Sequence, residues 1–342
     1  MSIKAAAIAL QTRVGDVPHN LALVEKMVQE AAAKGARIVA LPEFFTSAIT
    51  PDDRPYAAVL GEQNAAVDLL RALAQRHQIW IGGSLLQQAG DEIMNRYVLV
   101  EPKQQVHTHD KDLPTMWENA FYRGGQDAGV WDTELGTAGA AMCWELIRQQ
   151  TLRRMVGRVQ WVITGTHWWT LPLNWPGLGP NSLLLRGLAR RNAKLSETAP
   201  SVFARHLQVP VIQASHCGHF EGRFRLLAGT KLSLPYRTHF VGATQIVNAQ
   251  GEVLAMRRTQ EGPGIVYADI NIPTAAPTTA KAGSGFWIPR LPWIMQQYWD
   301  QQNWANRPVY DRRGRDLGLA AAKNNAALNA SSSSPSSTRK SA

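Results

Sequence analysis

The sequence predicts an α/β fold, and two observations support this prediction. Short apolar runs typical of buried strands alternate with segments in which apolar residues recur at helical spacing, and the alternation continues to about residue 270. Hydrophobic residues make up 45% of the 342 residues, which is enough to build a substantial core. Because no repeat of fixed period occurs, we expect a globular protein of alternating strands and helices.

The N-terminal third supplies the first strands and helices. Residues 5–10 form an apolar run expected to be a strand, and Asn20 is expected to cap a helix that ends at Lys34-Gly35. A short strand at 37–41 ends in Pro42-Glu43, which puts a carboxylate at the end of a buried strand. The expected elements that follow are a helix at 62–76 and strands at 79–84 and 96–100.

The middle of the chain continues the alternation. Strands at 130–133 and 138–142, joined by a turn at Gly136, lead to an expected helix at 146–156 and a strand at 161–164. A Pro- and Gly-rich loop at 171–180 precedes a helix at 182–196, and Pro200 is expected to start a separate short helix that ends near His206. The remaining expected strands are 209–214, 242–247, 253–256 and 265–270.

The C-terminal part has a different character. Residues 275–319 lose the periodicity but contain Trp287, Trp293, Trp299 and Trp304, which predicts an irregular arm that packs on the body or on a second subunit. Residues 320–342 are mostly Ala, Asn and Ser and are predicted to be disordered. We therefore expect a main domain at 1–274, a Trp-rich arm at 275–319 and a tail at 320–342.

Composition excludes several classes of protein. The net charge of +10 comes from scattered Lys and Arg without a recognition motif, which argues against nucleic-acid binding. No apolar stretch is long enough for a signal-peptide core or a membrane span. The two cysteines, Cys143 and Cys217, are too few for a disulfide framework, so we expect a cytoplasmic protein with both thiols free.

Three reactive side chains occupy similar positions. Cys143 ends an apolar strand that runs into a helix, where backbone N–H groups favour the reactive thiolate. Glu43 ends another strand, and Lys111 stands in the polar segment at 109–114. Each has an ordinary interpretation when taken alone: a cysteine packed in the core, a turn carboxylate and a surface lysine.

Together, the local sequences around these residues resemble the nitrilase superfamily of carbon-nitrogen hydrolases. The resemblance runs from about Ile3 to Ile272 and rests on four separated blocks in the family's order. These blocks are 35–43 (GARIVALPE), 109–118 (HDKDLPTMWE), 133–136 (TELG) leading to 142–145 (MCWE), and 240–254 (FVGATQIVNAQGEVL).

The resemblance implies a four-layer α-β-β-α sandwich, assembly into homodimers or larger oligomers, and catalysis without a metal or organic cofactor. It also implies a triad of Glu43 as base, Lys111 as cation and Cys143 as nucleophile, with Glu118 as a second glutamate beside it. These residue types suit attack of a thiolate on a nitrile or amide carbon, followed by hydrolysis of a thioester. Lys111 and the backbone N–H of Trp144 would stabilise the developing negative charge.

The substrate is less well defined by the sequence. Cys-Trp-Glu and the motif around Lys111 lean toward nitrilases, but residues 146–154, 165–169 and 171–180 differ from well-known nitrilases, so amides and N-carbamoyl compounds stay open. The residues expected to line a pocket for an apolar, aromatic acyl group are Trp144, His167, Trp168, Phe45 and Tyr122. Simple packing is the alternative for the tryptophans.

Other interpretations carry less weight. His216, Cys217 and His219, with His107 and His109, contain zinc-ligand types, but their spacing fits no closed structural site. A disulfide between Cys143 and Cys217 would remove the nucleophile. The remaining alternatives are a non-catalytic binding protein or an acyltransferase on the same fold, and the presence of all three triad residue types argues against loss of catalysis.

Overall fold

A computed structural model describes residues 2–172, 183–226 and 232–332 of the protein. Its strands are β1 (Ser2–Leu10), β2 (Ile38–Ala40), β3 (Trp80–Ala89), β4 (Glu92–Val100), β5 (Val106–Asp110), β6 (Val130–Thr133), β7 (Gly136–Met142), β8 (Trp161–Thr166), β9 (Val211–His216), β10 (His219–Arg225), β11 (Ser233–His239), β12 (Ala243–Val247), β13 (Val253–Arg258) and β14 (Gly264–Asn271). Twelve of them form one mixed sheet of order β5-β4-β3-β2-β1-β9-β8-β7-β6, with β12, β13 and β14 attached to it. The hairpin β10–β11 is separate.

Strand β1 joins the two halves of this sheet. It pairs in parallel with β2 through residues 5–7 and with β9 only through its last two residues, while β14 runs antiparallel along nearly its whole length. The halves can therefore diverge from β1 and face each other. A buried apolar cluster that includes Ile38 and Tyr97 from one half and Trp161 and Ile212 from the other is the core between them.

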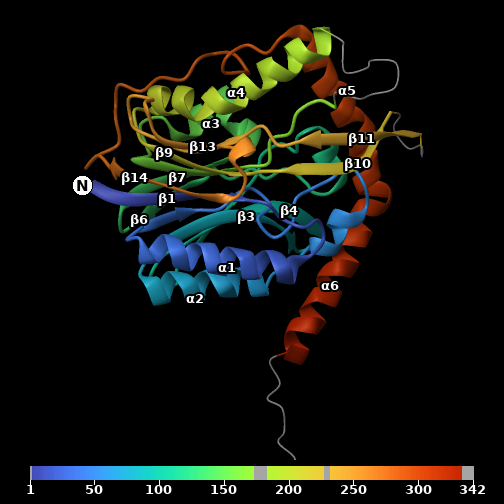
Figure 1. Ribbon diagram of the computed structural model, residues 1–342, viewed down its shortest axis with the longest axis horizontal. Coiled ribbons are helices and arrows are strands. Elements are labelled where there is room, and N and C mark those ends of the chain that lie inside the picture. Colours follow the sequence, from blue (N-terminus) through green and yellow to red (C-terminus); the bar gives the residue numbers. More distant parts are fainter. Residues whose placement is uncertain (1, 173–182, 227–231, 333–342) are drawn as a thin grey trace, which may run out of the picture.

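Helices cover the outer faces of the two halves of the sheet (Figure 1). Helices α1 (Val17–Ala33) and α2 (Ala65–His77) pack on the half that contains β2 to β4, and α3 (Gln149–Met155) and α4 (Leu183–Leu207) pack on the other half. The four-layer α-β-β-α sandwich is thus confirmed. Helices α5 (Trp293–Val309) and α6 (Arg315–Ser332) run along one end of the molecule, across the layers.

Three strands that precede the candidate residues point the same way. Strands β2, β7 and β8 are all parallel to their neighbours in the central sheet, so their carboxyl ends meet at one edge. Strand β5 returns in the same direction, because it is antiparallel to β4 and β4 is antiparallel to β3. Ligand sites in α/β sheets form outside such carboxyl ends, and the segments that follow these strands carry the candidate residues.

Two helix predictions are wrong in detail. Helix α1 begins at Val17 because the carboxylate of Asp16 accepts the His19 N–H, whereas Asn20 lies inside the helix and donates to the carbonyls of Arg13 and Thr46. Helix α4 continues through Pro200 instead of restarting there. Proline removes one helical hydrogen bond, but burial of neighbouring apolar side chains such as Phe203 offsets that loss.

The prediction of an irregular arm at 275–319 holds for residues 275–292, which contain no helix or strand, but it is wrong for residues 293–319, and the prediction of a disordered tail is wrong for residues 320–332. Residues 293–332 form α5, a π-helical turn at Tyr310–Gly314 and α6. Helix α6 is held on the body because Ala322 is buried and Asn325 donates to the carbonyls of Ala57 and Val59. Alanine is the best helix former, so composition alone did not exclude a helix here. The tail at 333–342 and most of the predicted loop, 173–180, lie outside the described residues.

Candidate active site

The candidate triad is brought together in a fully buried cluster. Glu43, Lys111 and Cys143 come just after β2, β5 and β7, and Glu118 lies in the short 3₁₀ helix η2 (Met116–Ala120). All four side chains have 0% of their surface exposed. Charged groups are rarely buried in this way unless they are paired, so we expect each charge of the cluster to have a partner.

The Glu43 carboxylate is held by three donors from different strands or strand ends. Its Oε1 accepts hydrogen bonds from Lys111 Nζ at 2.7 Å and from Asn95 Nδ2 at 2.8 Å. Its Oε2 accepts from the backbone N–H of His167 at 3.0 Å. The backbone of Gly165 in β8 passes so close that a Cβ there would lie 2.3 Å from the Glu43 nitrogen. These contacts fix the carboxylate in one orientation.

Lys111 bridges two carboxylates. Its Nζ lies 2.7 Å from Glu43 Oε1 and 2.7 Å from Glu118 Oε2. Glu118 Oε2 also accepts from the Thr115 N–H at 2.9 Å and from the hydroxyl of Tyr122. Its other oxygen, Oε1, is buried without a partner among the described residues. Glu118 therefore has one oxygen free to accept a hydrogen bond from a ligand.

Backbone conformation is unusual at three residues around the cluster. Cys143 has φ 52°, Phe44, which follows Glu43, has φ 57°, and Met116, two residues before Glu118, has φ 57°. Residues other than glycine rarely adopt the left-handed region, and such strain concentrates at functional sites. Cys143 begins the 3₁₀ helix η3 (Cys143–Ile147), so its thiol is presented at a tight strand-to-helix turn.

The charges in the cluster set its protonation states. Burial raises the pKa of Glu43 to about 7, because it outweighs the lowering effect of Lys111. Burial by itself would lower the pKa of Lys111, but the Glu118 and Glu43 charges hold that pKa well above its ordinary value. Burial, with the negative charge of Glu43, raises the pKa of Cys143 above its usual range. The resting state therefore favours a thiol beside a carboxylate that exchanges protons near neutral pH.

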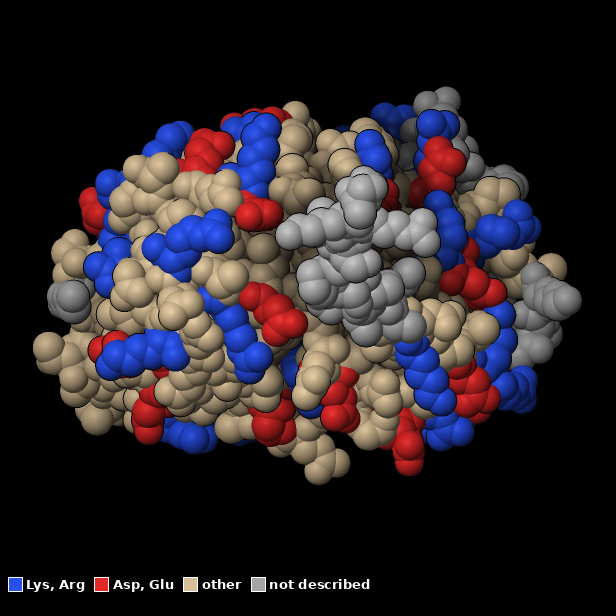
Figure 2. Space-filling view, turned by 90° about the horizontal axis from the view of Figure 1, so that it is seen from below, with Lys and Arg blue, Asp and Glu red and all other residues tan. Residues whose placement is uncertain are grey.

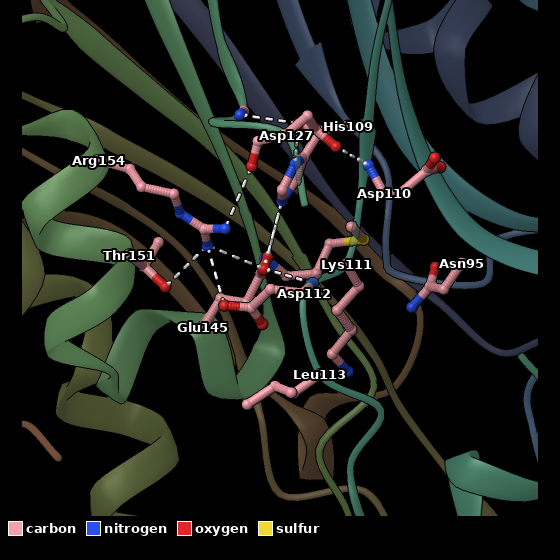
Figure 3. A network of polar contacts seen from close by, with 12 residues as sticks. Asn95, His109, Asp110, Lys111, Asp112, Leu113, Asp127, Glu145, Thr151 and Arg154 are labelled. Atoms are coloured by element: carbon pink, nitrogen blue, oxygen red, sulfur yellow. Dashed lines mark hydrogen bonds and ion pairs between the residues drawn. The ribbon is translucent and has the colours of Figure 1, made fainter. Parts of the chain in front are cut away.

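A second network of charged groups, buried at His109 and Glu145, lies beside Lys111 (Figure 3). His109 Nε2 lies 3.1 Å from Glu145 Oε2, and His109 Nδ1 lies 2.6 Å from Asp127 Oδ1. Arg154 Nη2 donates to Glu145 Oε1 at 3.4 Å and to Asp112 Oδ2 at 3.0 Å. The network ties the segment before Lys111 to the turn after Cys143.

Glu145 is the centre of this network. Its carboxylate also accepts hydrogen bonds from the backbone N–H of Met142 at 2.8 Å and from that of Asp112 at 3.0 Å. It therefore holds the residue before Cys143 and the residue after Lys111. Burial would raise the pKa of Glu145, but His109 and Arg154 keep it well below the usual range. Burial opposes the charged form of His109, yet Glu145 and Asp127 raise its pKa to about 10. His109 and Glu145 are therefore both charged at neutral pH.

The predicted pocket residues separate into three groups. Trp144 and Trp168 line a cavity of about 160 Å³. Tyr122 bonds Glu118, and His167 supplies its N–H to Glu43 while its ring packs against Phe44. Phe45 was predicted wrongly, because its side chain packs in the cluster beneath α1 and α2. Its neighbour Phe44, at positive φ, turns toward the site instead.

The predicted alternatives find other roles in the structure. His107 pairs with Glu101, and His216 bonds the Glu43 carbonyl at 2.7 Å. Within the described ranges, no group of three or more His, Cys, Asp or Glu is arranged to hold a metal ion. Cys143 and Cys217 are both free and buried.

Surface and helix composition add two observations. On the face drawn in Figure 2, basic and acidic side chains are interspersed rather than gathered into a basic patch. None of the helices in the described part of the chain is both long enough and apolar enough to cross a membrane.

Comparison with known proteins agrees with the geometry. The family model for carbon-nitrogen hydrolases matches residues 4–280. The chain belongs to the carbon-nitrogen hydrolase family. Among solved structures, a carbon-nitrogen hydrolase from Helicobacter pylori G27 superposes with a TM-score of 0.64 over 79% of this chain and 90% of that one, at 20% identity.

Curated relatives of this carbon-nitrogen hydrolase include both amidases and nitrilases. A chloroplastic omega-amidase from Arabidopsis thaliana is 29% identical over 40% of this chain and 41% of its own length. A bifunctional nitrilase/nitrile hydratase from Nicotiana tabacum is 25% identical over 42% of this chain and 47% of its own. The alignments thus span less than half of these relatives.

Sequence reasoning missed several residues that hold the site. Asn95 lies within a strand, and nothing in its local sequence marks it as a partner of Glu43. His109 entered as a zinc candidate and as part of a motif, and Glu145 only as part of a motif, so neither was expected to support the site. One signal was available: residues two apart in a strand share a face, so the end of β5 places His109 and Lys111 on the same side.

Proposed function

We propose that this protein hydrolyses a nonpeptide amide or nitrile to a carboxylic acid and ammonia or an amine, through a thioester on Cys143. The bridging of Lys111 between Glu43 and Glu118, at 2.7 Å to each, supports this proposal most strongly. The proposed reaction needs a fixed cation and a carboxylate of pKa about 7 near the thiol, and the charges of Lys111 and Glu43 both act on the pKa of Cys143. A base with a pKa near the working pH is the most effective proton acceptor.

In the first half of the reaction, Glu43 takes the thiol proton as Cys143 Sγ bonds to the substrate carbon. Negative charge develops on the amide oxygen or nitrile nitrogen, and Lys111 with the Trp144 N–H stabilises it. For an amide, the C–N bond then breaks and Glu43 returns the proton to the leaving nitrogen. A nitrile first gives a thioimidate, which takes up water and releases ammonia. Both routes leave the same thioester.

In the second half, water attacks the thioester carbon while Glu43 accepts a proton from that water. The C–S bond breaks, the proton returns to Sγ, and the acid departs. For an amide substrate, Glu118 would accept a hydrogen bond from the substrate N–H through Oε1, which has no partner among the described residues. The Lys111 charge stays fixed throughout, because its pKa lies well above neutrality.

Assembly and compartment belong to the same proposal. The family resemblance favours a homodimer or larger oligomer, and two free, buried thiols suit a reducing compartment such as the cytoplasm. Sedimentation equilibrium of the purified protein would give the oligomer size. A monomer at micromolar concentration would contradict the first expectation.

The test of the activity is ammonia release from a panel of nitriles, amides and N-carbamoyl compounds. Wild-type protein should release ammonia from at least one class, and Cys143→Ala should abolish it. Cys217→Ala is the matched control, because it removes the other buried thiol and should leave the rate unchanged. Full activity of Cys143→Ala would refute the mechanism. Absence of turnover across the panel would favour the alternative of a non-catalytic binding protein.

A further inference from the structure

The C-terminal helix α5 closes the apolar cavity that Trp144 and Trp168 line. Ile294, Met295 and Tyr298 of α5 form one wall. We propose that this arm makes the cavity an acyl-group pocket for an uncharged, ring-sized apolar substituent, and so sets the substrate class of the enzyme. The proposal rests on the proposed function, because it names the substrate of the same site.

The arm is hydrogen-bonded to the segment that follows Cys143 and to the segment that carries Glu118. Next to Cys143, the Ile288 N–H donates to the Ile147 carbonyl at 2.7 Å, and the Phe286 carbonyl accepts from the Gln149 N–H at 2.9 Å. Next to Glu118, the Asn303 side chain accepts from the Met116 N–H at 2.9 Å. A segment held at both places is a structural part of the site.

Three residues that line the cavity are close in sequence to residues of the catalytic cluster. Trp144 follows Cys143, Trp168 follows His167, whose N–H binds Glu43, and Met116 precedes Glu118 by two residues. Cys143 is fully buried and is not among the lining residues. A substrate in the cavity therefore reaches Sγ only after the side chains that cover the thiol move.

The residues that line the cavity disfavour a charged substituent on the substrate. None of the described lining residues is charged, and most of them are tryptophan or aliphatic. The Asn192 amide is already used, since it accepts from Trp168 Nε1 at 2.9 Å and donates to the Trp169 carbonyl at 2.8 Å. The Thr170 hydroxyl is buried without a partner among the described residues and could serve one uncharged polar substituent. A carboxylate would be left unpaired here, at high cost.

The volume suits one ring. At about 160 Å³, the cavity matches an apolar protein cavity of about 150 Å³ that binds benzene. The wall from α5 also lies outside the family match, which ends at residue 280. The family region thus supplies the reactive groups, and the chain's own C-terminal arm completes the acyl pocket.

The test compares phenylacetamide with acetamide, which lacks the ring, and with succinamate, which carries a carboxylate. Wild-type kcat/KM for phenylacetamide should exceed that for acetamide by at least about tenfold, because this is the fold-change that corresponds to the free energy of burying one aromatic ring. Met295→Glu should lower this ratio at least about tenfold, and the milder Met295→Gln less. Trp293→Glu is the matched control, because Trp293 lies on the same helix with 74% of its surface exposed. Thermal unfolding would verify that each variant is folded.

Binding measured on the Cys143→Ala protein separates this inference from the proposed function. Calorimetry should detect phenylacetamide but not succinamate, and Met295→Glu in that background should weaken phenylacetamide binding. Binding without any wild-type turnover would refute the hydrolase function and support the pocket. Cys143-dependent hydrolysis that prefers acetamide or succinamate would support the function and overturn the pocket. An equal loss in Met295→Glu and Trp293→Glu would also overturn it.

Discussion

Two buried charge clusters lie side by side at the carboxyl ends of β5 and β7, and they are built from residues two apart in each segment. Lys111 and Cys143 belong to one cluster, and His109 and Glu145 belong to the other. In the first, one cation faces two carboxylates, and burial leaves Glu43 with a pKa of about 7. In the second, cationic groups surround Glu145 and keep its pKa well below the usual range.

This difference separates reactivity from support. A carboxylate with a pKa near neutrality exchanges its proton easily, so the Glu43 cluster is suited to catalysis. Glu145 stays ionised, and its carboxylate anchors the Met142 and Asp112 backbones on either side of the triad. We therefore propose that the buried glutamate does chemistry in the first cluster and holds geometry in the second, because the surroundings of the two carboxylates shift their pKa values in opposite directions.

Removing the base should have the largest effect. Glu43→Gln keeps the shape of the side chain but takes away the proton acceptor, so we expect the catalytic rate on the best substrate of the panel to fall by about 10²–10⁴-fold. Thermal unfolding should show a folded variant of somewhat lower stability, because the single amide oxygen of Gln can keep the Lys111 and Asn95 contacts, whereas its NH2 group cannot accept the His167 N–H. A rate within about threefold of wild type, from a folded variant, would remove Glu43 from the mechanism.

Breaking the cluster around His109 and Glu145, which we call the supporting cluster, should act mainly on the stability of the protein. His109→Gln leaves Glu145 buried without its main partner, and we expect the free energy of unfolding to fall by about 3–5 kcal/mol in urea denaturation. The His109 pKa is raised, so its stabilisation is complete below the unfolded pKa near 6.5 and is lost as pH rises through about 10. The deficit of the variant should therefore shrink between pH 7 and 10. A constant deficit would argue against the charge pair.

A smaller loss of activity should follow removal of the Tyr122 hydroxyl. This hydroxyl donates to Glu118 Oε2, the same oxygen that holds Lys111. A hydrogen bond to a charged group contributes about 1.5–3 kcal/mol, so Tyr122→Phe should lower kcat/KM by about 10–100-fold with the aromatic packing kept. Tyr236→Phe is a control, because its hydroxyl bonds the Thr170 carbonyl and not the triad. Equal losses in the two variants would point to general destabilisation.

The smallest expected effect is at the rim of the supporting cluster. Arg154 is 15% exposed and bonds Asp112 and Glu145, so Arg154→Met should cost about 1–2 kcal/mol of unfolding free energy. Its exposed neighbour is the matched control: among the described residues, Arg153→Met loses a single contact, to the Gly283 carbonyl, and should be nearly neutral. Equal costs would show that Arg154 adds nothing to the cluster.

The fold was predictable where local pattern and burial agree. The strands before Glu43 and Cys143 are buried in the structure and apolar in the sequence. The order of these strands and the helices between them could be predicted from the pattern of apolar residues. The hairpin β10–β11 was missed because its residues are largely polar. Pro200 was taken for a helix start because the packing that tolerates it is tertiary. Helix α6 was missed for the same reason, because it depends on tertiary contacts with the body that composition does not reveal.

The triad was accessible through its motifs, but its supports were not. Glu43, Lys111 and Cys143 each stand in a recognisable block, whereas Asn95 gains its role only because β4 passes beside Glu43. The wrong choice of Phe45 over Phe44 has a backbone cause. The positive φ at Phe44 changes which of the two rings faces the site, and a sequence does not show that φ.

The central claim is that Glu43 titrates near neutrality and takes the proton from Cys143. The most direct test is the pH dependence of Cys143 alkylation by iodoacetamide, followed by mass spectrometry from pH 5 to 9 in a Cys217→Ala background. Glu43 accepts a proton only when ionised, so the rate should rise with a midpoint near pH 7, and Glu43→Gln should lose that rise. Identical profiles for the two proteins would contradict the account.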